Sequence, residues 1–329
     1  MLTTPIALII FNRPDKLRRV IEQVSLVKPA KLLVIADGPR PNHPSDVQRC
    51  AEARAVIEQV DWECQVLTNY SDTNLGCGRR PATGISWVFG QVEQAIILED
   101  DCVPHPTFFH FCQELLEKYR DDERIMHIGG INLYPSAAPY SYYFSRIPAC
   151  VGGWATWRRA WQYFDMDINL WPLLRGTDWL EDAFVEPRAV ELYRNIFDEA
   201  HIEGSNADYW DYQWVFACLA NHGLAILPAK TNLISNIGFD ADATHTTSSS
   251  DRRANLPLAE MVFPLRHPPH MVRDRATDQL RIKWMLGAAG RKNRSLFRSP
   301  RKIIAAVPAS LRREIRHLLA SQNRRRERV

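Results

Sequence analysis

The sequence lacks the cysteine spacings of a disulfide-rich domain or a structural zinc site. Its seven cysteines, at positions 50, 64, 77, 102, 112, 150 and 218, are odd in number and include no Cys-x-x-Cys pair. Disulfide frameworks and zinc modules both depend on regularly spaced, paired cysteines. We therefore expect free thiols and a cytoplasmic location.

Long apolar runs and glycine-rich phosphate loops are missing as well. The run at residues 5–11 is too short for a signal sequence, and no later run approaches the roughly 20 residues that a membrane-spanning helix needs. Neither Gly-x-x-x-x-Gly-Lys-Ser/Thr nor Gly-x-Gly-x-x-Gly follows the first apolar run. These absences speak against membrane insertion, a P-loop NTPase and a dinucleotide-binding Rossmann domain.

Charge is unevenly distributed along the 329 residues, although the net charge is only +3. Residues 291–329 hold 13 of the 41 basic residues and two of the 38 acids, which leaves 28 basic against 36 acidic residues, a net of −8, in residues 1–290. The chain is 46% hydrophobic, which is ample for a sizeable core. We expect a mildly acidic globular body and a strongly basic tail.

The first hundred residues alternate between short apolar runs and stretches with helical periodicity. The predicted strands are residues 5–11, 31–36, 64–68 and 95–98, and the predicted helices between them lie near residues 17–24, 47–60 and 83–92. This alternation predicts an α/β fold with a mainly parallel sheet flanked by helices. In such sheets, ligands bind at the carboxyl ends of the strands.

The fourth predicted strand ends at three consecutive carboxylates, Glu99-Asp100-Asp101. Adjacent acids repel one another, so their burial requires a compensating positive charge. A divalent cation, Mn²⁺ or Mg²⁺, suits this position because it is bound by a few carboxylates and leaves coordination sites for phosphate. An equally weighted alternative is a solvated acidic turn.

Three more charged residues follow predicted strands or their loops at the same edge of the sheet: Arg13, Asp37 and Arg80. Asp37 is suited to accept hydrogen bonds from a base or ribose, and the two arginines to meet a diphosphate. Simpler roles remain open, because Arg13 also suits a local ion pair and Asp37 a turn before glycine. Together these residues predict a nucleotide pocket.

A second acidic cluster begins at Asp208 and includes Asp211 among aromatic residues, at the start of a predicted helix. Asp211 is a candidate general base, because neighbouring rings raise a carboxyl pKa, or it caps the helix. His245, in a later polar loop, is either a ligand or a surface histidine. Residues 134–179 contain five tryptophans, of which we expect one or two to contact a sugar.

The order of these motifs resembles the GT-A glycosyltransferases. It is most similar to the inverting N-acetylglucosaminyltransferases of the type I, alpha-mannoside class and to their bacterial relatives, over about residues 5–246. The resemblance is carried by Ile97-Leu98-Glu99-Asp100-Asp101 with Pro106-Thr107-Phe108-Phe109 after it, and by Asn12-Arg13, Asp37, Gly152-Gly153-Trp154 and Trp210-Asp211.

The resemblance implies transfer of a sugar from a nucleotide-diphosphate donor, a UDP-sugar, with Mn²⁺ or Mg²⁺. Asp101 would bind the metal directly, while Glu99 and Asp100 would contact ribose or metal-bound water. Asp37 would hold the uracil and Arg13 the phosphates.

Asp211 would take the proton from the acceptor hydroxyl, with inversion at the anomeric carbon, and His245 would add a metal or diphosphate contact. The family's Trp-Asp-Asp-Trp motif is altered here, since Tyr212 replaces the second acid and one residue is added before Trp214. Asp208 is therefore an alternative base. Two alternatives to a glycosyltransferase follow: a non-catalytic nucleotide-sugar or glycan-binding protein, and a nucleotidyltransferase.

The basic tail has apolar residues at helical spacing from Ile303 to Leu319, with arginines between them. Such a helix suits an anionic membrane surface, which would fit a glycan or lipid-linked acceptor, or it docks on the body. Nucleic acid is a weaker option because no recognition motif accompanies the charge. We expect a GT-A-like domain at residues 1–250 and a C-terminal extension with a basic amphipathic helix at 251–329.

Overall fold

A computed structural model describes residues 2–149, 152–239 and 251–296 of the chain. The chain divides into a compact unit, Met1–Arg281, and a second unit, Ile282–Val329. The predicted boundary at residue 250 stays a prediction. The predicted tail helix at 300–329 and His245 lie outside the described residues.

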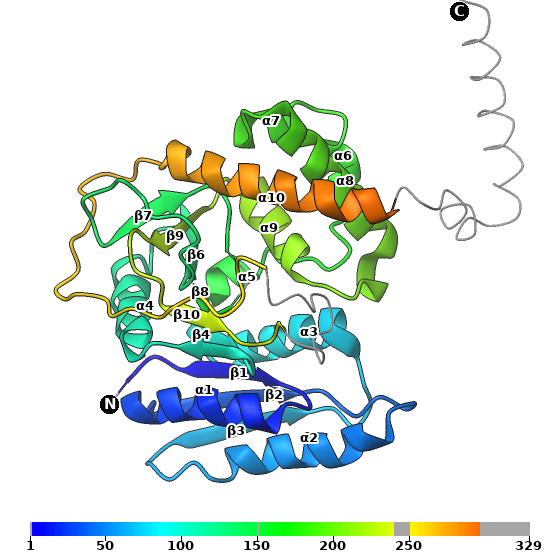
Figure 1. Ribbon diagram of the computed structural model, residues 1–329, viewed down its shortest axis with the longest axis vertical. Coiled ribbons are helices and arrows are strands. Elements are labelled where there is room, and N and C mark those ends of the chain that lie inside the picture. Colours follow the sequence, from blue (N-terminus) through cyan, green and yellow to red (C-terminus); the bar gives the residue numbers. More distant parts are fainter. Residues whose placement is uncertain (1, 150–151, 240–250, 297–329) are drawn as a thin grey trace, which may run out of the picture. The chain divides into compact units, whose positions relative to one another are not determined.

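The compact unit is built on an eight-stranded mixed sheet with the strand order β3-β2-β1-β4-β8-β6-β9-β7 (Figure 1). The first four neighbours run parallel, as do β6 and β9, whereas β8 runs antiparallel to both β4 and β6, and β7 antiparallel to β9. The strands are β1 (Ile6–Ile10), β2 (Lys31–Ala36), β3 (Gln65–Tyr70), β4 (Gln94–Glu99), β6 (Ile125–Gly129), β7 (Tyr142–Ser145), β8 (Trp154–Trp157) and β9 (Leu224–Pro228).

Helices cover the parallel half of the sheet. Helix α1 (Pro14–Val27) contacts α2 (Pro44–Ile57) and α4 (Pro106–Lys118), and α3 (Gly76–Gln91) contacts β1, β2 and β4. Right-handed crossovers put α1 and α2 on one face and α3 on the other, because the chain reverses its direction across the sheet between β3 and β4. The predicted α/β fold, with a mainly parallel sheet flanked by helices, is confirmed.

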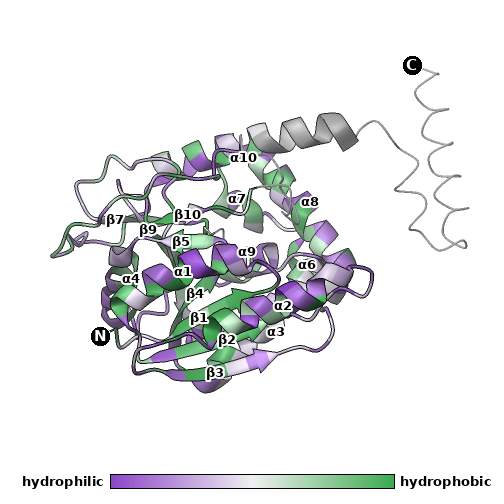
Figure 2. Cartoon of the chain, turned by 60° about the horizontal axis from the view of Figure 1, so that its bottom comes forward, coloured by the Kyte–Doolittle hydropathy of each residue, from purple (hydrophilic) through white to green (hydrophobic). Residues whose placement is uncertain are grey.

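The core follows from the apolar runs of the sequence. All five residues of β1 are buried, as a strand covered on both faces requires. Figure 2 shows the central strands as hydrophobic and the exposed faces of α1 and α2 as largely hydrophilic. Leu17, Val20 and Val24 form the buried stripe of α1, with the helical spacing that the sequence predicts.

The remaining elements follow the parallel half. A two-stranded antiparallel sheet joins β5 (Cys102–Pro104) to β10 (Ile234–Asn236). The other helical elements are α5 (Arg158–Trp161), α6 (Trp171–Leu174), α7 (Trp179–Ala183), α8 (Pro187–Glu203), η1 (Gly204–Asn206), α9 (Asp211–Ala220) and α10 (Arg275–Leu296). Within the described part of the chain, no helix combines the length and apolarity that crossing a membrane requires.

Candidate functional site

The register of the sheet places the charged residues at one edge. Ile10 of β1 pairs with Ala36 of β2, and Ile9 of β1 pairs with Glu99 of β4. Asp37 and Asp100, each the next residue after its strand, therefore leave the sheet within one residue of the same level. This edge is the carboxyl end of the parallel strands, where ligands of α/β proteins bind.

Asp100 is fixed by the end of β1. Its backbone N–H donates to the carbonyl of Ile9 at 3.0 Å, and its carboxylate accepts the N–H of Phe11 at 2.9 Å. Only 6% of Asp100 is exposed. The side chain is therefore held in place by the backbone at the end of β1.

Asp101 has a cation on one oxygen and a thiol on the other. Arg13 Nη1 donates to Asp101 Oδ2 at 2.6 Å, and the Cys102 thiol donates to Oδ1 at 3.2 Å. The backbone carbonyl of Asp101 accepts the N–H of Ile237 at 2.8 Å. A Cβ on Gly238 would lie 1.9 Å from Oδ2, so only glycine leaves this carboxylate in place.

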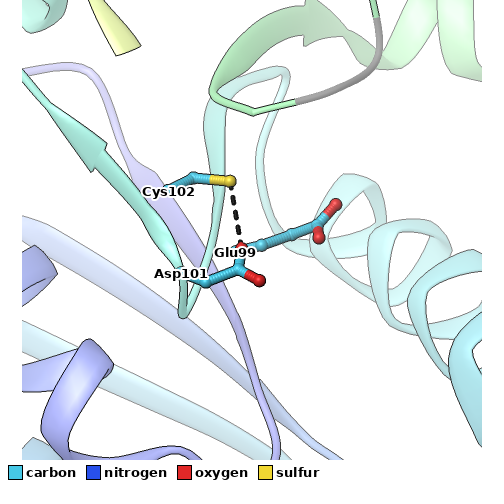
Figure 3. A group of neighbouring side chains, drawn as sticks. All are labelled: Glu99, Asp101 and Cys102. Atoms are coloured by element: carbon cyan, nitrogen blue, oxygen red, sulfur yellow. Dashed lines mark hydrogen bonds between the residues drawn. The ribbon is translucent and has the colours of Figure 1, made fainter. Parts of the chain in front are cut away.

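Glu99, Asp101 and Cys102 bring their side-chain ligand atoms within 4.8 Å of one another (Figure 3). The two carboxylates fit Mn²⁺ or Mg²⁺, which prefer oxygen ligands. Burial raises the pKa of the Cys102 thiol well above its usual range, so the sulfur keeps its proton and holds Asp101. The donor set thus fits a hard divalent cation bound by oxygens.

The three acids share too little positive charge for all to ionise readily. Burial, and then repulsion from Asp101, raise the pKa of Glu99 and also that of Asp100 above their usual values, while Arg13 opposes both shifts. A divalent cation would relieve this repulsion and favour the ionised forms. The electrostatics of the triplet therefore suit a site that gains positive charge on ligand binding.

Asp37 organises the start of α3. Its carboxylate accepts the N–H groups of Leu75 at 2.8 Å and Gly76 at 2.9 Å, and the Asn74 side-chain amide at 3.0 Å. The N–H groups at the start of a helix have no partner within the helix. Asp37, which follows β2, accepts two of them for α3. The helix accordingly begins at Gly76, seven residues before the predicted start at 83, so Arg80 lies within its first turns.

Arg80 lies on α3 and is 5% exposed. Its Nε donates to the carbonyl of Ala36 at 3.0 Å, and its Nη2 donates to both the carbonyl and the side-chain oxygen of Asn69. These contacts tie the ends of β2 and β3 together. The expected diphosphate contact stays a prediction, and these hydrogen bonds would have to be shared or broken to make it.

Asp211 is the first residue of α9. The approach of its segment to the acidic edge is set by Gly78 of α3, where a Cβ would lie 2.0 Å from the carbonyl oxygen of Ala207. The charge of Asp211 contributes to the raised pKa of Glu99, which puts the two carboxylates in one electrostatic neighbourhood. Asp208 lies in the same segment, and its backbone carbonyl accepts the Cys77 thiol at 2.7 Å.

Four tryptophans pack against one another in the core, and the expected sugar contact of one or two of those in residues 134–179 stays a prediction. The ring of Trp154 lies 5.5 Å from that of Trp210 and 5.8 Å from that of Trp214, and both contact Trp161 as well. Each of these four is at most 6% exposed. This packing anchors Trp210, and with it the start of α9 beside the acids.

The structure adds two residues that the sequence pattern did not single out. Cys102 holds Asp101 by a hydrogen bond, and Gly238 makes room for its carboxylate. The position of Cys102, directly after the acids, was a usable signal. Gly238 gives no local signal, because a side chain at this position is excluded by Asp101, which lies more than a hundred residues earlier in the chain.

No protein family matches this chain by sequence, and no curated protein does so either. Among solved structures, S. aureus TarS 1-349 aligns over 70% of this chain and 60% of its own, with 8% identity and a TM-score of 0.38. The same protein in complex with UDP-GlcNAc gives 8% identity, 70% and 58% coverage and a TM-score of 0.37. UDP-glucose pyrophosphorylase complexed with UDP-glucose gives 11% identity, 49% and 78% coverage and a TM-score of 0.30.

The chain spans less than two thirds of the TarS chains that it matches. At these identities and TM-scores the likeness supports no conclusion about this chain. The architecture stated above rests on the strand order and register of this chain itself.

Proposed function

We propose that this chain is a glycosyltransferase that moves a sugar from a nucleotide-diphosphate donor, a UDP-sugar, to an acceptor hydroxyl with inversion. The observation that supports it most is the Glu99-Asp100-Asp101 triplet at the carboxyl end of β4, in which Asp100 and Asp101 are buried and Glu99 is half-buried, with Arg13 against it. Carboxylates at a strand end beside a cation suit a metal-bound diphosphate.

In this proposal Asp101 would hold Mn²⁺ or Mg²⁺, which would supply charge stabilisation to the departing diphosphate. Glu99, expected from the sequence to contact ribose or metal-bound water, lies near enough to Asp101 to be a second metal ligand. Asp100 contacts ribose or metal-bound water. Asp37 binds the uracil of the donor, and Arg13 and Arg80 bind its phosphates. His245, which lies outside the described residues, adds a metal or diphosphate contact.

Asp211 takes the proton from the acceptor hydroxyl. The segment that carries Asp211 is held by the packing of Trp210 on the buried Trp154 and by the close approach of Gly78 to Ala207. The position of the Asp211 carboxylate is therefore fixed. A general base needs such fixed placement toward the reacting hydroxyl. A single in-line displacement then inverts the anomeric carbon.

The acceptor is a glycan or a lipid-linked hydroxyl. The basic sequence of residues 300–329 supports the second choice, since clustered arginines with apolar spacing favour an anionic membrane surface. This would place the enzyme peripherally on the inner face of the membrane, with no role for nucleic acid.

The test is calorimetric titration of the full chain with UDP, GDP, CMP and dTDP, each with and without Mn²⁺. We expect one nucleotide, UDP, to bind in a Mn²⁺-dependent manner, and Asp101→Ala to abolish that binding. Asp121→Ala is the matched control, because Asp121 is exposed and precedes β6 at the other end of the sheet. Unchanged UDP affinity in Asp101→Ala would contradict the assignment.

The altered base motif favours one second candidate, a non-catalytic nucleotide-sugar or glycan-binding protein. Tyr212 stands where the related family has its second acid. Both candidates predict donor binding, so turnover separates them. Release of UDP from a bound UDP-sugar in the presence of acceptor glycans supports the transferase, and tight binding without release supports the binding protein.

A further inference from the structure

Arg13 has an unusual position for the residue that precedes a helix. It is the N-cap residue of α1, but its guanidinium has only donors and so cannot cap the free N–H groups of the helix. The guanidinium points to the acids instead, with Nη1 at 2.6 Å from Asp101 Oδ2 and 3.8 Å from Asp100 Oδ1. The side chains of Arg13, Asp100 and Asp101 are 13%, 8% and 10% exposed.

We propose that Arg13 occupies the cation position on Asp101 in the absence of metal and yields it when metal and donor bind together. Arg13 is then an internal counter-ion that exchanges with the divalent cation. The part of this inference that concerns the donor rests on the proposed function; the competition for Asp101 does not.

The geometry makes the two cations competitors. Asp101 Oδ1 is engaged by the Cys102 thiol, and Oδ2 carries the short contact to Arg13 with Gly238 packed beside it. Mg²⁺ bonds carboxylate oxygen at about 2.0–2.1 Å, so a metal ion on Oδ2 would have to share with Arg13 an oxygen that the guanidinium already contacts. Two positive groups so close in a poorly solvated site repel each other strongly.

Because Arg13 and Asp101 are largely buried, the replacement of Arg13 by a metal ion changes the affinity for both metal and diphosphate. Removing Arg13 would leave Asp101 a buried carboxylate without this cation, which is an unfavourable state that metal binding relieves. A nucleotide diphosphate offers the displaced guanidinium a second anion, which suits its planar set of donors. Binding of metal and diphosphate is therefore coupled, and each raises the affinity for the other by the same factor.

The experiment measures Mn²⁺ binding alone, without nucleotide, by the loss of the free Mn²⁺ signal in electron paramagnetic resonance. We expect Arg13→Gln to bind Mn²⁺ at least about fivefold more tightly than the wild type, within the usual range of coupling between sites. Arg18→Gln is the matched control. Arg18 lies on the same helix, is exposed and pairs with Asp15, so its loss removes the same charge without freeing Asp101.

Arg13→Lys provides a second test that keeps the positive charge. It replaces Arg13→Gln if thermal unfolding shows that the glutamine variant is poorly folded. Its shorter side chain is expected to hold Asp101 less well, which gives a Mn²⁺ affinity between those of the wild type and the glutamine variant. Equal or weaker Mn²⁺ binding in a folded Arg13 variant would overturn the inference.

A repeat of the titration with saturating UDP distinguishes this inference from the proposed function. We expect UDP to raise Mn²⁺ affinity in the wild type by a larger factor than in Arg13→Gln. A gain in Mn²⁺ affinity with no UDP binding in either protein would support the competition and contradict the glycosyltransferase. UDP-dependent Mn²⁺ binding with no gain in Arg13→Gln would support the glycosyltransferase and contradict the competition.

Discussion

His127 makes the stability of the fold depend on pH in a way that can be calculated. It lies in β6 with no exposed surface, and its ring stacks on Trp154 at 5.2 Å. Nε2 lies 3.2 Å from the carbonyl oxygen of Ala149, and Nδ1 lies 3.3 Å from Nε1 of Trp214. The neutral ring satisfies both contacts, with Nε2–H as donor and Nδ1 as acceptor.

Burial lowers the pKa of His127 from 6.5 to about 3. Below pH 6.5 the unfolded chain binds a proton at this residue that the folded chain excludes, so the folded state loses stability as the pH falls toward 3. At about 1.4 kcal/mol per pH unit, the loss between pH 7.5 and pH 5 comes to roughly 2 kcal/mol.

The assay is urea unfolding of the wild type and of His127→Gln at pH 7.5, 6 and 5. The variant should be less stable at pH 7.5, because a packed ring is lost, but its stability should fall by roughly 2 kcal/mol less between pH 7.5 and 5. His110→Gln is the control, since His110 is exposed on α4. Parallel pH dependence in the wild type and His127→Gln would refute the reasoning.

Three further perturbations test other contacts. Gly238→Ala should leave the protein folded but abolish Mn²⁺ binding measured by calorimetry, because the new Cβ would lie 1.9 Å from Asp101 Oδ2. Asp278→Ala should lower the free energy of unfolding in urea by about 3 kcal/mol or more, since this fully buried acid pairs with Arg273 at 2.6 Å. Asp211→Asn should bind UDP with wild-type affinity in calorimetry but show no sugar transfer, as expected of a general base. Asn at this position preserves the shape and removes the basicity, so full transfer activity would reassign the base.

The parallel half of the fold was readable from sequence because β1, β2 and β4 are buried on both faces, while the edge strand β3 is partly exposed. The apolar run 31–36 corresponds to β2 as predicted, and the alternation of runs and helical spacing gives the order of β1 to β4. The later half was harder. Strand β8 is inserted between β4 and β6, and nothing in a local pattern indicates which distant strand a short segment joins.

The acidic edge was predicted from strand ends, whereas the contacts of its members were not. Asp37 reads as a ligand-binding residue in sequence, but in the structure its carboxylate also fixes the start of α3 through Leu75 and Gly76. Arg80 reads as a phosphate contact and is engaged by carbonyl groups of neighbouring strands. Side-chain to backbone contacts of this kind depend on tertiary approach, which composition and spacing do not encode.

The insertion of β8 constrains the order in which the chain can assemble. Strands β1 to β4 form from consecutive strand–helix units, so this half of the sheet can build up as it emerges. Strand β6 cannot join it directly, because its place lies beyond β8, a segment that comes later in the chain. Pairings between distant segments are slow to form, and the second half of the sheet therefore waits for residues 154–157 before it can extend the first.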